Sequence, residues 1–138
     1  MSVMQDNWRT AFSLTALWLL GGCSLPAPQL SEHVSLCLIS DPQPSDQNYH
    51  LEVTYTTDNF EYTSIRDPAC NVAYYVIEPE AWSEGYREFR SRLKNSPYGP
   101  VFQEFELEVV GRFRPTHSGR NIGFAIDDVL RIEEVRKR

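Results

Sequence analysis

The chain has 138 residues, a hydrophobic fraction of 41% and a formal net charge of −6 at pH 7. This length and composition are typical of a protein with one domain and its own hydrophobic core. The acidic balance argues against nucleic acid as a partner, because phosphate contacts need clustered lysine and arginine side chains.

The N-terminal segment combines a short apolar stretch with a cysteine that follows two small residues. The stretch at 10–20 is about 11 residues long, shorter than the roughly 20 that a membrane-spanning helix needs. It ends in Leu20-Gly21-Gly22-Cys23, the pattern of a bacterial lipobox. We therefore expect residues 1–22 to be a signal peptide and Cys23 to carry acyl chains. The alternatives are an ordinary secretory signal and a buried apolar helix.

The lipobox also predicts where the remainder of the chain resides. Residues 23–32 contain two prolines and few large apolar residues, which is typical of a tether, here lipidated, and residues 33–138 form the domain. Ser24 occupies the position where an aspartate favours retention in the inner membrane. We expect a protein anchored through lipid, facing the periplasm, in the outer membrane of the cell envelope rather than the inner membrane.

Two further cysteines, Cys37 and Cys70, lie within the domain. In an oxidising compartment such a pair is expected to form a disulfide. A bridge that closes a loop of this length would stabilise a small domain by roughly 3 kcal/mol. The alternative, two reduced thiols or a metal-binding pair, lacks nearby histidines that would complete a site.

The domain begins with an apolar segment, 34–39, that is too short to distinguish a strand from a helical turn. Apolar and polar residues then alternate through 51–56, and a turn falls at Asp58-Asn59. A second run rich in β-branched and aromatic residues starts at Phe60. This pattern predicts a β-hairpin.

A third strand and a helix are predicted next. The run 72–77 is apolar almost throughout, which predicts a strand covered on both faces. Pro79 suits the first turn of a helix, and the helical pattern ends near Asn95. The helix has an apolar face at helical spacing, made of Trp82, Tyr86, Phe89 and Leu93.

Two long strands are predicted in the last third of the chain, on either side of a polar turn at 115–121. The second of them starts at Ile122, and Asp127-Asp128 interrupts its alternation, which predicts a bulge or bend. A glycine inside the first strand fits sharp coiling of the sheet. The first strand has an apolar face made of Phe105, Leu107, Val109, Gly111 and Phe113.

The predicted order of elements is three strands, a helix and two strands. This is the order found in the OB-fold, a five-stranded Greek-key barrel. We therefore predict a mainly β domain with an OB-fold-like barrel and one helix between strands 3 and 4. The alternative is an α+β antiparallel sheet with one packed helix.

Three short segments resemble those of small, uncharacterised bacterial envelope lipoproteins with an OB-fold-like barrel. The resemblance spans most of the chain from 51 to 135 and implies a fold and a cellular address, but no activity. The segments are Val53-Thr54-Tyr55, Ile65-Arg66-Asp67-Pro68-Ala69-Cys70 and Val109-Val110-Gly111-Arg112-Phe113.

No residue set forms a recognisable catalytic site, so we predict that the protein is not an enzyme. Ser118, His117 and Asp127 are the residue types of a hydrolase triad. However, no Gly-x-Ser-x-Gly elbow surrounds the serine, and neighbours on one turn are poorly placed as nucleophile and base.

Metal and cofactor sites are not predicted either. The acidic pairs at 127–128 and 133–134 supply carboxylates for calcium but lack the Asp-x-Asp-x-Asp-Gly loop. His33, His50 and His117 show no ligand spacing, and the sequence has no glycine-rich phosphate loop.

A binding face is predicted beside the last loop of the barrel. OB-type barrels bind ligands along one face, between the first hairpin loop and the loop that joins the last two strands. We expect an anionic group or an acidic partner to meet the guanidinium groups there. The alternative is that these arginines balance Glu104, Glu106 and Glu108 across the sheet. The predicted binding residues are Arg112, Arg114, His117, Arg120 and Asn121.

These observations favour a non-enzymatic lipoprotein that binds another protein, or assists assembly, in the cell envelope. An alternative is an inhibitor or immunity-type lipoprotein, which would block a periplasmic hydrolase with a loop that plugs the active site. A hydrolase is the weaker alternative.

Overall fold

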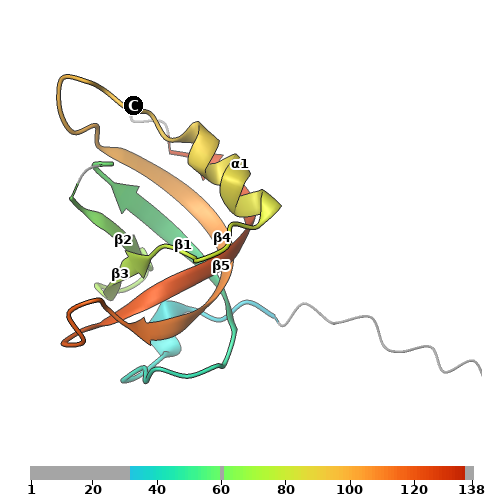
Figure 1. Cartoon of the computed structure of the whole chain (residues 1–138). Coiled ribbons are helices and arrows are strands. Elements are labelled where there is room, and N and C mark those ends of the chain that lie inside the picture. Colours follow the sequence, from blue (N-terminus) through green and yellow to red (C-terminus); the bar gives the residue numbers. More distant parts are fainter. Residues whose placement is uncertain (1–31, 60, 136–138) are drawn as a thin grey trace, which may run out of the picture.

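A computed structural model describes residues 32–59 and 61–135 (Figure 1). The predicted signal peptide and the lipidation site Cys23 lie outside the described residues. In chain order the elements are η1 (Leu36–Leu38), β1 (Tyr49–Thr57), β2 (Thr63–Arg66), β3 (Ala73–Ile77), α1 (Glu84–Arg92), β4 (Gln103–Pro115) and β5 (Ile122–Glu134).

The five strands of the described residues close into a barrel in the order β1-β2-β3-β5-β4. Neighbouring strands are antiparallel except β3 and β5, which run parallel. The helix α1 lies between β3 and β4 in the chain and packs on β5 (Figure 1). The predicted OB-fold-like barrel is confirmed. The alternative of an α+β sheet is wrong, because the sheet closes on itself.

The inner face of β4 forms the centre of the hydrophobic core. Phe105, Leu107, Val109 and Phe113 are at most 1% exposed, which confirms the apolar face predicted from their alternation. Burying these side chains supplies a large part of the free energy that stabilises the barrel. The Phe113 ring packs edge-on against three other aromatic rings, those of Tyr49, Tyr74 and Phe124.

The long strands β4 and β5 coil around the barrel with the help of a glycine and two bulges. A Cβ atom at Gly111 would collide with the carbonyl oxygen of Ala125, so only glycine permits this close approach. The register between the strands shifts twice, which leaves Asp127 and Leu130 without an opposite residue on β4. The irregularity predicted near Asp127 is therefore confirmed as a β-bulge.

The segment 34–39, which the sequence leaves undecided, forms a single bridge followed by a short 3-10 turn. Val34 pairs in parallel with Leu51 of β1, and Leu36 in η1 is fully buried. The predicted disulfide between Cys37 and Cys70 is present, with 5.9 Å between the Cα atoms. It fastens η1 to the turn between β2 and β3.

The helix begins later than the sequence predicts. α1 starts at Glu84 rather than near Pro79, and Trp82, expected on the apolar face, precedes the helix and is 41% exposed. The cause is Ser83, whose side chain accepts the backbone N–H of Tyr86 at 3.0 Å and caps the helix. The Ser83 hydroxyl also donates to Asp128 of β5, which fixes this start against the barrel.

The strand β3 also differs from its prediction. Tyr74 packs against the core, whereas the next side chain, Tyr75, is 56% exposed. The strand therefore alternates and has one open face, although a strand covered on both faces was predicted. The physical reason is that α1 packs on β5 and leaves the outer face of β3 uncovered.

Candidate functional site

The open face of β3 borders a groove on the outside of the barrel, which we call the β3 groove. It consists of two adjoining hollows, of about 650 and 440 Å³, that share Ile77, Glu78 and Glu80. The first hollow lies between β3 and the loop that joins β4 to β5. The second lies between the segment that leads from β3 to α1 and the outer faces of β4 and β5.

Small residues on β5 make this groove possible. In the barrel register, Gly123 of β5 lies between Tyr75 of β3 and Arg114 of β4. Two residues further along β5, Ala125 lies between Ile77 of β3 and a second arginine of β4, Arg112. Gly123 and Ala125 therefore leave open space on the outer face of β5, between the side chains of β3 and the arginines of β4.

The structure brings four of the five predicted binding residues to this groove. His117 and Asn121 line the first hollow, and Arg112 and Arg114 line the second. Arg120 is exposed on the same loop but lines neither hollow. Four of the predicted residues thus share one groove, but its lining includes no residue of the first hairpin loop, the other expected border of the face.

The two arginines of the groove are already paired with acids of the same chain. Arg112 contacts Asp127 at 3.2 Å, and Arg114 contacts Asp46 at 3.0 Å. Asp46 also lies 3.8 Å from Arg112. These carboxylates neutralise the guanidinium groups, so an acidic partner would have to displace them.

The acids that balance the arginines differ from those considered in the sequence alternative. Glu104 contacts Arg66 at 3.3 Å, and Glu108 contacts His50 at 2.6 Å. Two of the three glutamates of β4 thus pair across to other strands. The bulge in β5 explains the difference, because it places the carboxylate of Asp127 beside Arg112.

The β3 side of the first hollow was not predicted as a binding surface, including Tyr75, Glu78 and Glu80. Tyr75 was assigned to a strand covered on both faces, and Glu80 to the first turn of a helix. Glu78 contacts Arg90 of α1 at 3.0 Å. Glu80 is exposed and forms no ion pair with any residue in 32–59 or 61–135. The run 72–77 contains no alternation of apolar and polar residues that would have identified the open face.

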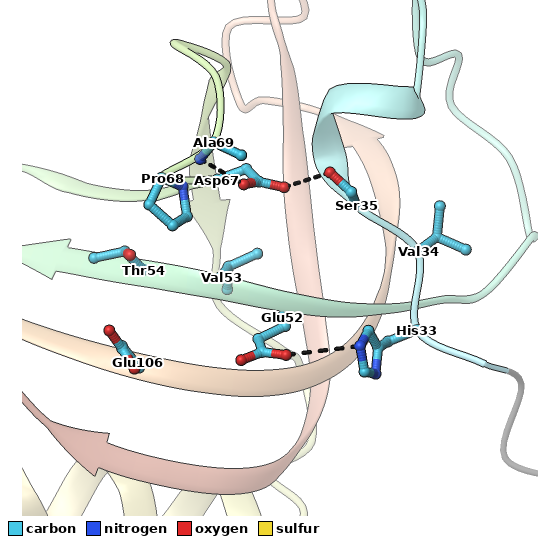
Figure 2. A pocket seen from close by; sticks show the side chains of 10 residues that line it. All are labelled: His33, Val34, Ser35, Glu52, Val53, Thr54, Asp67, Pro68, Ala69 and Glu106. Atoms are coloured by element: carbon cyan, nitrogen blue, oxygen red, sulfur yellow. Dashed lines mark hydrogen bonds and ion pairs between the residues drawn. The ribbon is translucent and has the colours of Figure 1, made fainter.

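A separate hollow of about 340 Å³ lies where the described chain begins, and we call it the N-terminal pocket. It is bordered by residues 33–35, by β1 and by the turn that follows β2. Figure 2 shows Asp67 at one side of this pocket, with its carboxylate between Ser35 and Ala69. The carboxylate accepts the Ser35 hydroxyl at 2.6 Å and the Ala69 backbone N–H at 2.9 Å.

These hydrogen bonds make Asp67 a structural group. Asp67 is only 6% exposed, and the Ser35 hydroxyl and nearby backbone N–H groups hold its pKa below the ordinary value. Its carboxylate lies close to both Cys37 and Cys70, the only cluster of metal-ligand type among the described residues. Because the two sulfur atoms are bonded to each other, this cluster acts as a brace between η1 and the β2–β3 turn.

Of the two other acids that line the N-terminal pocket, Glu52 is occupied by ion pairs. Glu52 contacts Arg131 at 3.0 Å and His33 at 3.7 Å. The rings of His33 and His50, predicted to be scattered, lie 5.8 Å apart. Glu106 is the exception, since it forms no ion pair within the described part of the chain.

The residue sets considered for catalysis and calcium are not assembled in the described structure. The Ser118 hydroxyl lies 3.1 Å from the Thr116 hydroxyl, and Asp127 is engaged by Arg112. The acidic pairs are separated as well, since Asp128 accepts from Ser83 while Glu133 and Glu134 contact basic side chains.

Comparison with family models, curated proteins and solved structures finds no match to this chain. Within the described residues, no helix combines the length and apolar character that crossing a membrane requires. The features of the chain that bear on its function are therefore the sequence motifs and the geometry of the β3 groove.

Proposed function

We propose that this chain is a membrane-anchored lipoprotein of the bacterial cell envelope whose barrel binds another protein without catalysing a reaction. The observation that carries the proposal is the β3 groove, which joins the exposed Tyr75 ring to the loop between β4 and β5. This loop is one of the two that border the ligand-binding face of OB-type barrels. Exposed tyrosines are enriched at protein interfaces because one end of the ring is apolar and the other polar.

The proposed address is supported by two separate features of the chain. The first is the lipobox sequence that ends at Cys23. The second is the disulfide between Cys37 and Cys70, a bond that persists in oxidising compartments such as the periplasm. Lipidation uses the third cysteine and leaves this pair for the bridge.

The binding role is tested by photo-crosslinking in the native envelope. A photoreactive amino acid replaces Tyr75 in the β3 groove or, as a matched control, Val34 beside the N-terminal pocket. Both side chains are exposed, at 56% and 38%. We expect a discrete protein adduct from position 75 and none from position 34. Adducts from position 34 alone, or from neither, would contradict the proposed binding face.

The anchor is tested by metabolic labelling with a fatty-acid probe. The wild-type chain should incorporate label and fractionate with membranes, whereas Cys23→Ser should do neither because it lacks the acyl acceptor. Cys37→Ser serves as the control and should keep its label. An unlabelled wild-type chain that retains residues 1–22 would refute the anchor.

An inhibitor role is a second candidate, favoured by the loop between α1 and β4. Tyr98 in this loop is 97% exposed and Phe102 is 64% exposed. The loop is braced by the β1–β2 loop, since the Val101 backbone N–H donates to the Asp58 carbonyl at 3.0 Å. Such a preorganised aromatic loop suits insertion into an active-site cleft. A photoreactive residue at position 98 would then capture a hydrolase, and position 75 would not.

A further inference from the structure

We infer that the first hollow of the β3 groove receives a lysine or arginine side chain from a basic segment of the partner protein. The cationic end would meet Glu80, and the alkyl chain would lie along Ile77 beside the Tyr75 ring. This inference rests on the proposed function, because it specifies the chemistry of the partner that the groove binds. The arginines alone predict an acidic partner, whereas this inference assigns a basic one.

The charge of the hollow carries the first step. Its lining includes two carboxylates, Glu78 and Glu80, and neither arginine of the groove. Arg90 neutralises Glu78 at 3.0 Å, but no cation among the described residues pairs with Glu80. The hollow therefore keeps an uncompensated negative charge, which a cationic side chain complements and an acidic one does not.

The neighbouring arginines do not alter this balance. Arg112 is held by Asp127 at 3.2 Å, and Arg114 by Asp46 at 3.0 Å. The second hollow, which these arginines line, also shares Glu78 and Glu80 with the first. An incoming carboxylate would thus have to displace an existing ion pair and approach unpaired negative charge at the same time.

The apolar wall carries the second step. The Ile77 side chain lies over Gly123, where any added Cβ would come within 3.0 Å of it. Beside it, the Tyr75 ring is 56% exposed. Long basic side chains bury their alkyl chains on such surfaces, and their cations are attracted to the faces of aromatic rings. The hollow therefore combines an apolar wall with an unpaired carboxylate.

The inference is tested by fluorescence anisotropy with the full chain in neutral detergent micelles. The probes are dye-labelled oligolysine, oligoglutamate and a neutral oligosaccharide. We expect oligolysine to bind and the other two to bind at least tenfold more weakly. Glu80→Gln should weaken oligolysine binding about fivefold, the size expected for one partly exposed charge pair.

A matched substitution separates the groove from the general acidity of the chain. Glu106→Gln changes the charge by the same amount at an exposed glutamate of the N-terminal pocket, and should leave oligolysine binding unchanged. Tyr75→Ala should weaken binding, and Tyr75→Phe should retain it because the aromatic face remains.

Several results would overturn the inference. These are equal losses from Glu80→Gln and Glu106→Gln, preference for oligoglutamate or the oligosaccharide, and no binding of oligolysine. If crosslinking from position 75 still captures a protein in that case, the proposed function stands and only the basic character of the partner is wrong. If position 75 captures nothing, the proposed function itself fails.

Discussion

The β3 groove and the N-terminal pocket are two hollows on the outside of one barrel, and both are lined by acids. Each contains one glutamate with no ion pair among the described residues, Glu106 in the pocket and Glu80 in the groove, so they differ in what surrounds that carboxylate. In the N-terminal pocket, Asp67 accepts hydrogen bonds from Ser35 and Ala69, and Glu52 is paired with Arg131. In the first hollow of the groove, Glu80 instead shares the lining with Ile77 and the exposed Tyr75 ring. Acidic lining alone therefore does not define a binding site in this protein.

The two hollows also differ in what their residues do for the fold. The N-terminal pocket is a joint at which the Cys37–Cys70 disulfide and Asp67 fasten η1 to the β2–β3 turn. The groove contains side chains, such as Tyr75, that project from the finished barrel. Substitutions in the pocket should therefore reduce stability, whereas substitutions in the groove should reduce binding.

The largest effect is expected from removal of the disulfide. The double substitution Cys37→Ser with Cys70→Ser should lower the free energy of unfolding by about 3–4 kcal/mol, because the bridge joins residues 33 positions apart. Urea unfolding of the wild-type chain with and without reductant gives the same comparison. A loss below about 1 kcal/mol would show that the joint is not what stabilises this end of the barrel.

A smaller effect is expected at Asp67. Asp67→Asn should lower the free energy of unfolding by about 1–3 kcal/mol, because it weakens charge-assisted hydrogen bonds in a buried position. Tyr75→Ala in the groove is the control and should change stability by less than about 0.5 kcal/mol, as exposed positions usually do. A larger loss from Tyr75→Ala than from Asp67→Asn would reverse the roles of the two hollows.

The contribution of Asp67 should also depend on pH. Its pKa in the folded protein lies below the ordinary value of 3.8, so folding favours the ionised carboxylate. The stability that it provides is complete above that value and is lost as pH falls through the lower folded pKa. The difference in unfolding free energy between wild type and Asp67→Asn should therefore shrink as pH drops below about 4. A difference that grows on acidification would contradict this assignment.

Much of the barrel could be predicted because the alternation of apolar and polar residues within each long strand shows which side chains face the core. In β4, alternation of apolar and charged residues placed Phe105 and Phe113 inside, and both are buried. The start of α1 was mispredicted although Ser83 is a residue type that favours the N-cap, because Pro79 offers a competing local start. The hydrogen bond from Ser83 to Asp128, which joins residues far apart in the sequence, supports the later start and has no local signal.

The candidate site was only partly predictable, for the same reason. The loop residues His117 and Asn121 were assigned from the order of the strands, and they do line the groove. The sequence gives no local indication that Asp46, in a distant loop, pairs with Arg114. Nor does an apolar run reveal that Tyr75 is left uncovered by a helix that packs on another strand.

The most direct test is hydrogen–deuterium exchange of the full chain with and without oligolysine. It asks whether the β3 groove binds the basic probe and whether the N-terminal pocket serves only the stability of the fold. We predict slower amide exchange on binding at 75–80 and 116–121, and no change at 33–35 and 67–69. Protection at 33–35 and 67–69, with none at 75–80, would contradict the account.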